Sequence, residues 1–175
     1  MKTSITKRLC RAGIIAALYT TLTYVFAPFA FGPFQIRPAE ALCLLALIYP
    51  EAIPALAVGC ALSNLASPYA FYDITFGSLT TLLSAFITYL VGAKLKNKPL
   101  KIFVGGLFPV LLNAFLIPFV IVFLCDGGGD SVWVAYFTFV GSFLLTQSVW
   151  VYGLGAPLYL SVARLKKQGL RFLAD

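Results

Sequence analysis

The chain alternates long, uncharged apolar runs with short basic segments. A helix needs about 20 apolar residues to cross the roughly 30 Å hydrocarbon core of a bilayer. Four charge-free runs reach this length, and a fifth, Ala52 to Tyr72, is expected to end as a helix near Ala66 because Ser67-Pro68 follows. We therefore predict an all-α membrane protein. The four long runs are Ala12 to Phe31, Ile74 to Ala93, Ile102 to Cys125 and Ser131 to Ala163.

A sixth apolar segment, from Ala39 to Tyr49, is much shorter. At 1.5 Å per residue, its about 12 residues extend only about 18 Å, which is too little to span lipid without help. A short segment at membrane depth is tolerated where protein covers it or where it lines a cavity. We therefore predict that this segment packs against the other helices and returns the chain from the outer to the inner side.

Charge decides how many segments cross the membrane. The chain is 61% hydrophobic and 11% charged, and its net charge is +7. Twelve of the 13 basic residues fall in three clusters, and the positive-inside rule places such clusters in the cytoplasm. Six crossings put all three clusters and both termini inside, with outer loops at 31–37 and 126–130, whereas five crossings leave one cluster outside. The clusters lie at residues 2–11, 94–101 and 164–171.

Other classes of function find little support in the sequence. The basic residues lie beside apolar helices, where they face anionic lipid, so we expect no nucleic-acid partner. There is no histidine, and the four cysteines lack metal-ligand spacing, so we predict neither a metal nor a cofactor. No nucleophile elbow or fixed carboxylate pair points to an enzyme. We interpret residues 1–175 as one integral domain that crosses the cell membrane several times.

The few polar residues in or beside the apolar runs are the candidates for a binding site, because ionisable groups are costly at membrane depth and usually functional. With six crossings, Arg37, Glu40, Asn64 and Asp73 fall near the outer face and predict an outward polar pocket. Two alternatives stay open. Arg37 and Glu40 are three residues apart and can pair with each other, and Asp73 can cap the following helix. Glu51, on the inner turn, is expected to start a helix.

The first helix carries a row of small residues. Ala12, Ala16 and Thr20 lie at positions i, i+4 and i+8, which lets another helix approach closely. That helix belongs either to a partner chain or to the protein's own bundle.

Several segments resemble the QueT family. The resemblance extends from about Arg8 to Leu158 and is most specific in the first half of the chain. Its segments are IAALY at 15–19, FGPFQIRPAEAL at 31–42, YPEAIP at 49–54, DITFGSLTTL at 73–82, PVLLNA at 109–114 and YGLGAPL at 152–158.

This resemblance implies a substrate-binding S component of an energy-coupling factor (ECF) transporter. Such a six-helix bundle captures a queuosine precursor of the 7-deazaguanine type, or queuine, and docks on a membrane coupling protein and two cytoplasmic ATPases. In S components an A-x-x-x-A face is thought to meet the coupling protein, which assigns that role to Ala12, Ala16 and Thr20. The chain has no GxxxxGK[ST] phosphate loop, so an ATP-driven step would belong to another chain.

The resemblance also suggests how the ligand is held. Glu40 and Asp73 can accept hydrogen bonds from a ring N–H and an exocyclic amine, and the amides of Asn113 and Gln147 can serve a carbonyl and the ring edge. Many relatives carry Gly-Glu where this chain has Thr146-Gln147. The missing carboxylate leaves open another vitamin-like or purine-like ligand, and a carrier that works without partner chains is a further alternative.

Overall fold

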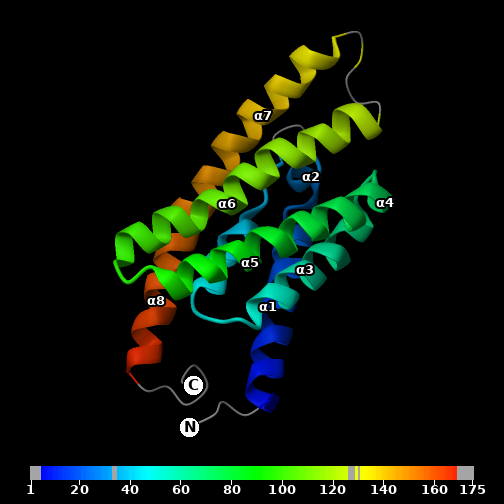
Figure 1. The fold of residues 1–175 in the computed structure, drawn as a ribbon. Helices are drawn as coiled ribbons and strands as arrows, with labels where there is room; N and C mark the ends of the chain where they lie inside the picture. The colour runs from blue at the N-terminus through cyan, green and yellow to red at the C-terminus, as the bar shows by residue number, and fades with distance from the viewer. Residues whose placement is uncertain (1–4, 33–34, 126–128, 130, 169–175) are drawn as a thin grey trace.

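The computed structural model describes residues 5–32, 35–125, 129 and 131–168. These residues form helices joined by turns, and no strand occurs among them, which confirms the all-helical fold class. Figure 1 shows the long helices packed side by side, with the cyan segment that contains η1 between them. The elements are α1 (Ile5–Val25), α2 (Ala27–Ala30), η1 (Pro38–Leu47), α3 (Ala52–Ser63), η2 (Asn64–Ala66), α4 (Ala70–Tyr72), η3 (Asp73–Gly77), α5 (Ser78–Lys94), α6 (Lys98–Phe119), η4 (Val120–Leu124), α7 (Val132–Ser148), η5 (Val149–Gly155) and α8 (Ala156–Lys167).

The short apolar segment forms η1, a 3₁₀ helix of 10 residues that are all buried. At a rise of about 2.0 Å per residue it extends about 20 Å. Runs of 3₁₀ helix longer than three or four residues are uncommon because their hydrogen bonds have poorer geometry. Here η1 contacts α1, α3, α5, α6, α8 and η5, so packing on all sides supports it. The prediction that this segment packs against the other helices is confirmed.

Three glycines make room for η1. A Cβ atom on Gly92 would lie 2.6 Å from the carbonyl oxygen of Leu47, and one on Gly155 would lie 2.8 Å from that of Ala41. On the third side, a Cβ atom on Gly105 would lie 2.7 Å from Cδ2 of Leu47. Real Cβ atoms do not approach backbone this closely, so α5 and η5 can lie against η1 only because positions 92 and 155 lack a side chain, whereas at Gly105 the Leu47 side chain would have to move.

Three continuous helices are long and apolar enough to cross a membrane: residues 70–94, 98–124 and 132–167. They match three predicted spans, and the segment from Ala52 to Ala66 ends where the sequence predicts. That segment and η1 are shorter apolar helices. Six crossings therefore remain a prediction. The expected outer loop at 126–130 lies, apart from Gly129, outside the described residues.

Large apolar side chains cover the outside of the bundle. On α5, for example, Leu83, Phe86 and Leu90 are exposed on one face, and Leu79 extends the same row. Soluble monomers rarely expose continuous apolar patches of this kind, whereas lipid requires them. The exterior and the three long apolar helices identify a membrane protein.

The basic residues of α1, α6 and α8 gather at one end of the bundle, where Figure 1 shows the start of α1 and the end of α8. The Arg11 guanidinium lies 4.5 Å from the Tyr49 ring centre, and the Lys166 ammonium lies 5.2 Å from the same ring. Lys98 shares a surface recess with Lys167. The three basic clusters predicted to share one side of the membrane therefore meet at one end of the fold.

Glu51 starts α3 and also pairs with a basic residue. It occupies the N-cap position immediately before α3, as predicted, although its side chain makes no cap hydrogen bond there. Its Oε1 atom instead lies 2.7 Å from Nη2 of Arg11, and both side chains are buried. A buried carboxylate needs a charged partner, and the basic first helix supplies one.

We expect Gly92→Ala to destabilise the protein, because the added Cβ meets the backbone of η1 and overpacking costs about 1–3 kcal/mol. Gly141→Ala is the matched control, since nothing lies within 4 Å of its Cβ position on α7. Thermal unfolding in detergent should show a lower midpoint for the first variant and no loss for the second. Equal midpoints for the two variants would contradict the packing of η1 against α5.

Candidate functional site

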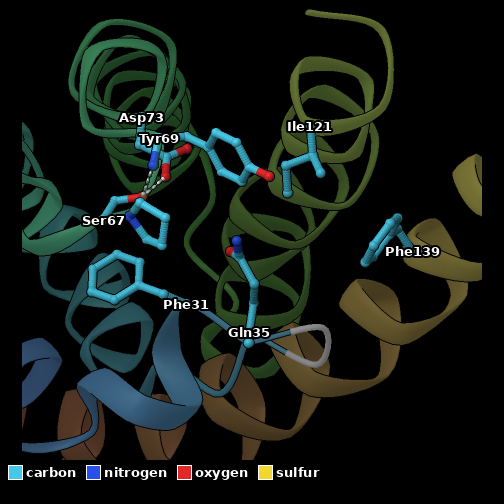
Figure 2. Close-up of a pocket in the computed structure, with 9 residues that line it drawn as sticks. Phe31, Gln35, Ser67, Tyr69, Asp73, Ile121 and Phe139 are labelled. Carbon is cyan, nitrogen blue, oxygen red and sulfur yellow. Dashed lines mark hydrogen bonds between the residues drawn. The ribbon is translucent and has the colours of Figure 1, made fainter. Parts of the chain in front are cut away.

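A pocket with about 620 Å³ of empty space, including its open mouth, lies at the end of the bundle opposite the basic residues. Its walls come from the turns after α2 and η2, from η3 and η4, and from α7 (Figure 2). The residues that line it are Phe31, Gly32, Gln35, Ser67, Pro68, Tyr69, Asp73, Ile121 and Phe139.

Asp73 is the acidic residue of this pocket and is 5% exposed. The Ser67 hydroxyl donates a hydrogen bond to its Oδ2 atom, and the Tyr69 backbone N–H donates to the Ser67 oxygen at 3.1 Å. Behind the pocket, the Asn64 amide donates to the Asp73 backbone carbonyl at 2.7 Å. The carboxylate is thus held in place by its neighbours, and Asn64 contacts Asp73 without lining the pocket.

Asp73 does not cap a helix. The helix begins at Ala70 and continues through the π-helical η3 into α5, and Asp73 makes no side-chain cap hydrogen bond. The capping alternative is therefore wrong. A π-helical turn is rare and is frequently found at functional sites. Here it carries the pocket carboxylate.

Gln35 is a pocket residue that sequence reasoning missed. Its side chain is 5% exposed, and Figure 2 shows it pointing into the middle of the pocket. Its backbone has φ 41°, a left-handed conformation that costs a residue with a Cβ about 1–2 kcal/mol. Such strained residues cluster at functional sites. Nothing in the local sequence signals this conformation, because glycine or asparagine is usual there.

Aromatic rings frame the same pocket. In Figure 2, Phe31 stands beside Ser67, Tyr69 reaches across toward Ile121, and Phe139 closes the far side. Flat rings offer surfaces on which a planar ligand can stack. The pocket therefore combines a carboxylate, an amide and aromatic walls.

Glu40 belongs to a second polar group, deeper in the bundle. It is 1% exposed and accepts a hydrogen bond from the Tyr19 hydroxyl at 2.6 Å. The Cys43 thiol donates to it at 3.3 Å, and the Asn113 amide donates at 3.4 Å. The structure thus brings together the predicted residues Glu40 and Asn113, but neither lines the pocket that contains Asp73.

Arg37 lies behind the pocket wall. Its Nε atom donates to the Ala30 carbonyl at 3.1 Å, and its guanidinium lies 5.2 Å from the ring centre of Phe31. Within the described part of the chain it forms no ion pair with Glu40, so the proposed pairing of these two residues is wrong. Its contacts position the wall that carries Phe31.

Gln147 is buried in α7 at the level of the second polar group. Phe143, one turn before it, packs with Ala114, and Val151, one turn after it, packs with Val110. Asn113 lies between Val110 and Ala114 on α6, so Gln147 on α7 lies at the same depth in the bundle as Asn113.

Several buried polar atoms have no hydrogen-bond partner among the residues that the structure describes. Leaving such an atom unpaired costs about 1–3 kcal/mol, so these atoms mark places where a water or ligand atom would be stabilised. Three of these residues, Arg37, Asn64 and Gln147, were selected from the sequence. The unpaired atoms are Nη2 of Arg37, Oδ1 of Asn64, Oγ of Ser78, Oγ1 of Thr81 and Oε1 of Gln147.

The small residues of α1 face α3. The Thr20 hydroxyl donates to the Gly59 carbonyl at 3.2 Å, and a Cβ atom on Gly59 would lie 3.0 Å from the carbonyl oxygen of Ala16. Ala12 and Ala16 also pack against the core. These contacts match the alternative in which the row packs within its own bundle.

An apolar exterior and long apolar helices define a helical membrane protein, and one end of its bundle holds a pocket lined by a carboxylate, an amide and aromatic rings. The sequence profile of the QueT transporter family matches residues 9–164, and the chain belongs to this family. The resemblance noted from the sequence is therefore confirmed.

One curated relative is the queuosine precursor transporter QueT of Lactococcus lactis subsp. cremoris (strain MG1363). It is 35% identical over 85 residues, which are 47% of this chain and 50% of the relative. The match thus spans about half the length of that protein. No solved structure matches the chain.

We expect Tyr19→Phe to lower the free energy of unfolding by about 1–3 kcal/mol, because it leaves the buried Glu40 carboxylate without its shortest hydrogen bond. Tyr24→Phe, on the same helix, removes a hydroxyl that bonds the Leu62 carbonyl at an exposed position and should change stability by less than about 0.5 kcal/mol. Thermal unfolding of the two variants in detergent measures the difference. A larger loss for Tyr24→Phe would argue against a structural role for the inner group.

Proposed function

We propose that this chain is the substrate-binding component of a transporter for a queuosine precursor, a base of the 7-deazaguanine type or queuine. The observation that carries the proposal is the pocket in which a fixed Asp73 carboxylate faces an amide and aromatic rings. Membership of the QueT family and the name of the Lactococcus relative support the same substrate class.

The chemistry of a deazaguanine base fits these groups. Its ring N–H and exocyclic amine are neighbouring donors, and a carboxylate accepts such a pair in two parallel, charge-assisted hydrogen bonds. The Gln35 amide can donate one hydrogen bond and accept another at the edge of the base that does not face Asp73. Phe31 and Tyr69 can stack on the flat ring.

In this proposal, the other residues selected from the sequence do not contact the ligand but support the pocket from behind. Asn64 holds the backbone of Asp73, and Arg37 supports the wall that carries Phe31. Glu40, Asn113 and Gln147 form a deeper polar layer that stabilises the inner side of the site. We assign the direct contact with the base to Asp73, because it lines the pocket, whereas Glu40 lies deeper and accepts hydrogen bonds from three protein groups.

We further propose that the transporter is of the energy-coupling factor type, in which a membrane coupling protein and two ATPases drive release. The sequence has no nucleotide-binding loop of its own. Ala16 and Thr20 pack on α3, so the coupling protein would contact the adjoining face of α1, where Gly13 and Ala17 are exposed.

Binding by the purified chain tests the ligand. The probes are 7-aminomethyl-7-deazaguanine, 7-cyano-7-deazaguanine and queuine, and we expect at least one to bind at micromolar concentration or below. Asp73→Asn keeps the shape of the side chain but removes its charge, and should weaken that binding by about 10- to 100-fold. Thr75→Val, an exposed change in the same π-helical turn, should leave it unaltered.

Liposomes that contain only this chain should bind the ligand without accumulating it. Accumulation without partner chains would contradict the coupling proposal and favour an autonomous carrier. Failure of all three compounds to bind would remove the ligand assignment.

We propose that the pocket faces outward and the basic end faces the cytoplasm, as the positive-inside rule requires. Tyr69→Cys at the pocket and Lys96→Cys between α5 and α6 test this in a background with Cys10→Ser and Cys125→Ser, since Cys43 and Cys60 are buried. An impermeant maleimide should label intact cells at position 69 but not at 96. Both positions should react after permeabilisation, and the reverse pattern in intact cells would invert the topology.

A further inference from the structure

The basic end of the bundle contains a recess with a charged rim and an apolar floor. It has about 960 Å³ of empty space, including its open mouth, and lies between the start of α6 and the end of α8. Lysines from both helices form its rim. The recess is lined by Leu47, Ile48, Lys98, Lys101, Tyr159, Ala163, Lys166 and Lys167.

The charged side chains that line this recess are all lysines. Among the residues that the structure describes, no aspartate or glutamate lines it. Glu51, near the same end, is already engaged by Arg11 at 2.7 Å. Lys101 and Lys166 lie close enough for their charges to repel each other. An anion bound between the two helices would relieve this repulsion.

The floor of the recess is apolar, and this favours an anion that carries an apolar chain over a small inorganic ion. Leu47 and Ile48 form the inner part, and the Tyr159 ring and Ala163 continue it along α8. A free phosphate ion would use only the charged rim. A phospholipid would place its phosphate on the lysines and lay an acyl chain on the apolar surface, as basic pockets between membrane helices do for anionic lipids.

We propose that this recess binds the headgroup of an anionic phospholipid between α6 and α8. The site rests on the membrane location of the helices and not on the identity of the transported ligand. A lipid bound there bridges the two helices that enclose the end of η1, and so stabilises the bundle at the end remote from the pocket.

Native mass spectrometry of the detergent-solubilised protein tests the proposal with dioleoyl phosphatidylglycerol and, for comparison, dioleoyl phosphatidylcholine. We expect bound phosphatidylglycerol and little phosphatidylcholine. The double variant Lys101→Gln/Lys166→Gln should weaken phosphatidylglycerol binding about tenfold or more. The charge-matched control Lys94→Gln/Lys96→Gln changes lysines outside the recess and should retain binding.

A second variant separates a lipid site from a simple anion site. Ala163→Trp fills the apolar floor without altering charge, and should also reduce phosphatidylglycerol binding. Equal losses in the two lysine variants, or full binding by Ala163→Trp, would overturn the proposal in favour of general charge attraction. So would displacement of the lipid by millimolar inorganic phosphate, which would indicate a free-anion site.

Two further readouts keep these results interpretable. Unchanged binding of the transported ligand by each variant would show that the pocket end is intact, so a loss of lipid would be local. If the protein bound phosphatidylglycerol but no deazaguanine, the lipid site would be supported and the proposed transport substrate would be wrong.

Discussion

The burial of η1 is the constraint on which the rest of the structure depends. A ten-residue 3₁₀ helix is poorly stabilised by its own hydrogen bonds and must be enclosed by protein on every side. Glycines at 92, 105 and 155 allow that enclosure, because they bring the surrounding helices against η1 without an intervening Cβ. One end of η1 follows Arg37 and carries Glu40, and the other reaches Leu47, so its position affects both the polar layer and the basic recess.

The polar groups of the interior divide into two kinds. Glu40 accepts hydrogen bonds from Cys43 in the same helix and from Tyr19 and Asn113 on two other helices, which makes it a structural element of an otherwise apolar bundle. Asp73 is also held in place by neighbouring groups, but it lines an open pocket, where we propose that it contacts the ligand. Unbonded buried atoms are costly in this environment, so the cost of those near the pocket is recovered only when water or a ligand is present.

Predictions from the sequence were correct for properties that depend on the composition of consecutive residues. They were wrong where the backbone conformation of a short segment decides which groups meet. The ends of the three long apolar helices and the end of the segment at Ala66 were placed within about four residues because hydropathy and Ser67-Pro68 act locally, whereas the first helix begins and ends earlier than predicted, at Ile5 and Val25. The Arg37–Glu40 pair was wrong because Arg37 precedes η1 in a non-helical conformation, with φ −117° and ψ 89°, and its side chain is directed to Ala30. The Asp73 cap was wrong because the helix begins earlier, at Ala70, and continues through a π-helical turn.

By itself, the sequence determined that the chain is helical and lipid-embedded, which segments are too short to span, and which few polar residues are worth attention. These properties sum over neighbouring residues, so no fold is needed to see them. The tertiary structure alone decided that Gln35 enters the pocket, that Asp73 and Glu40 belong to separate sites, and that lysines 98 and 166 share one recess. These relations join residues that are distant in the chain, such as Gln35 and Phe139 at the pocket, and only the packing of helices around η1 brings such distant residues together.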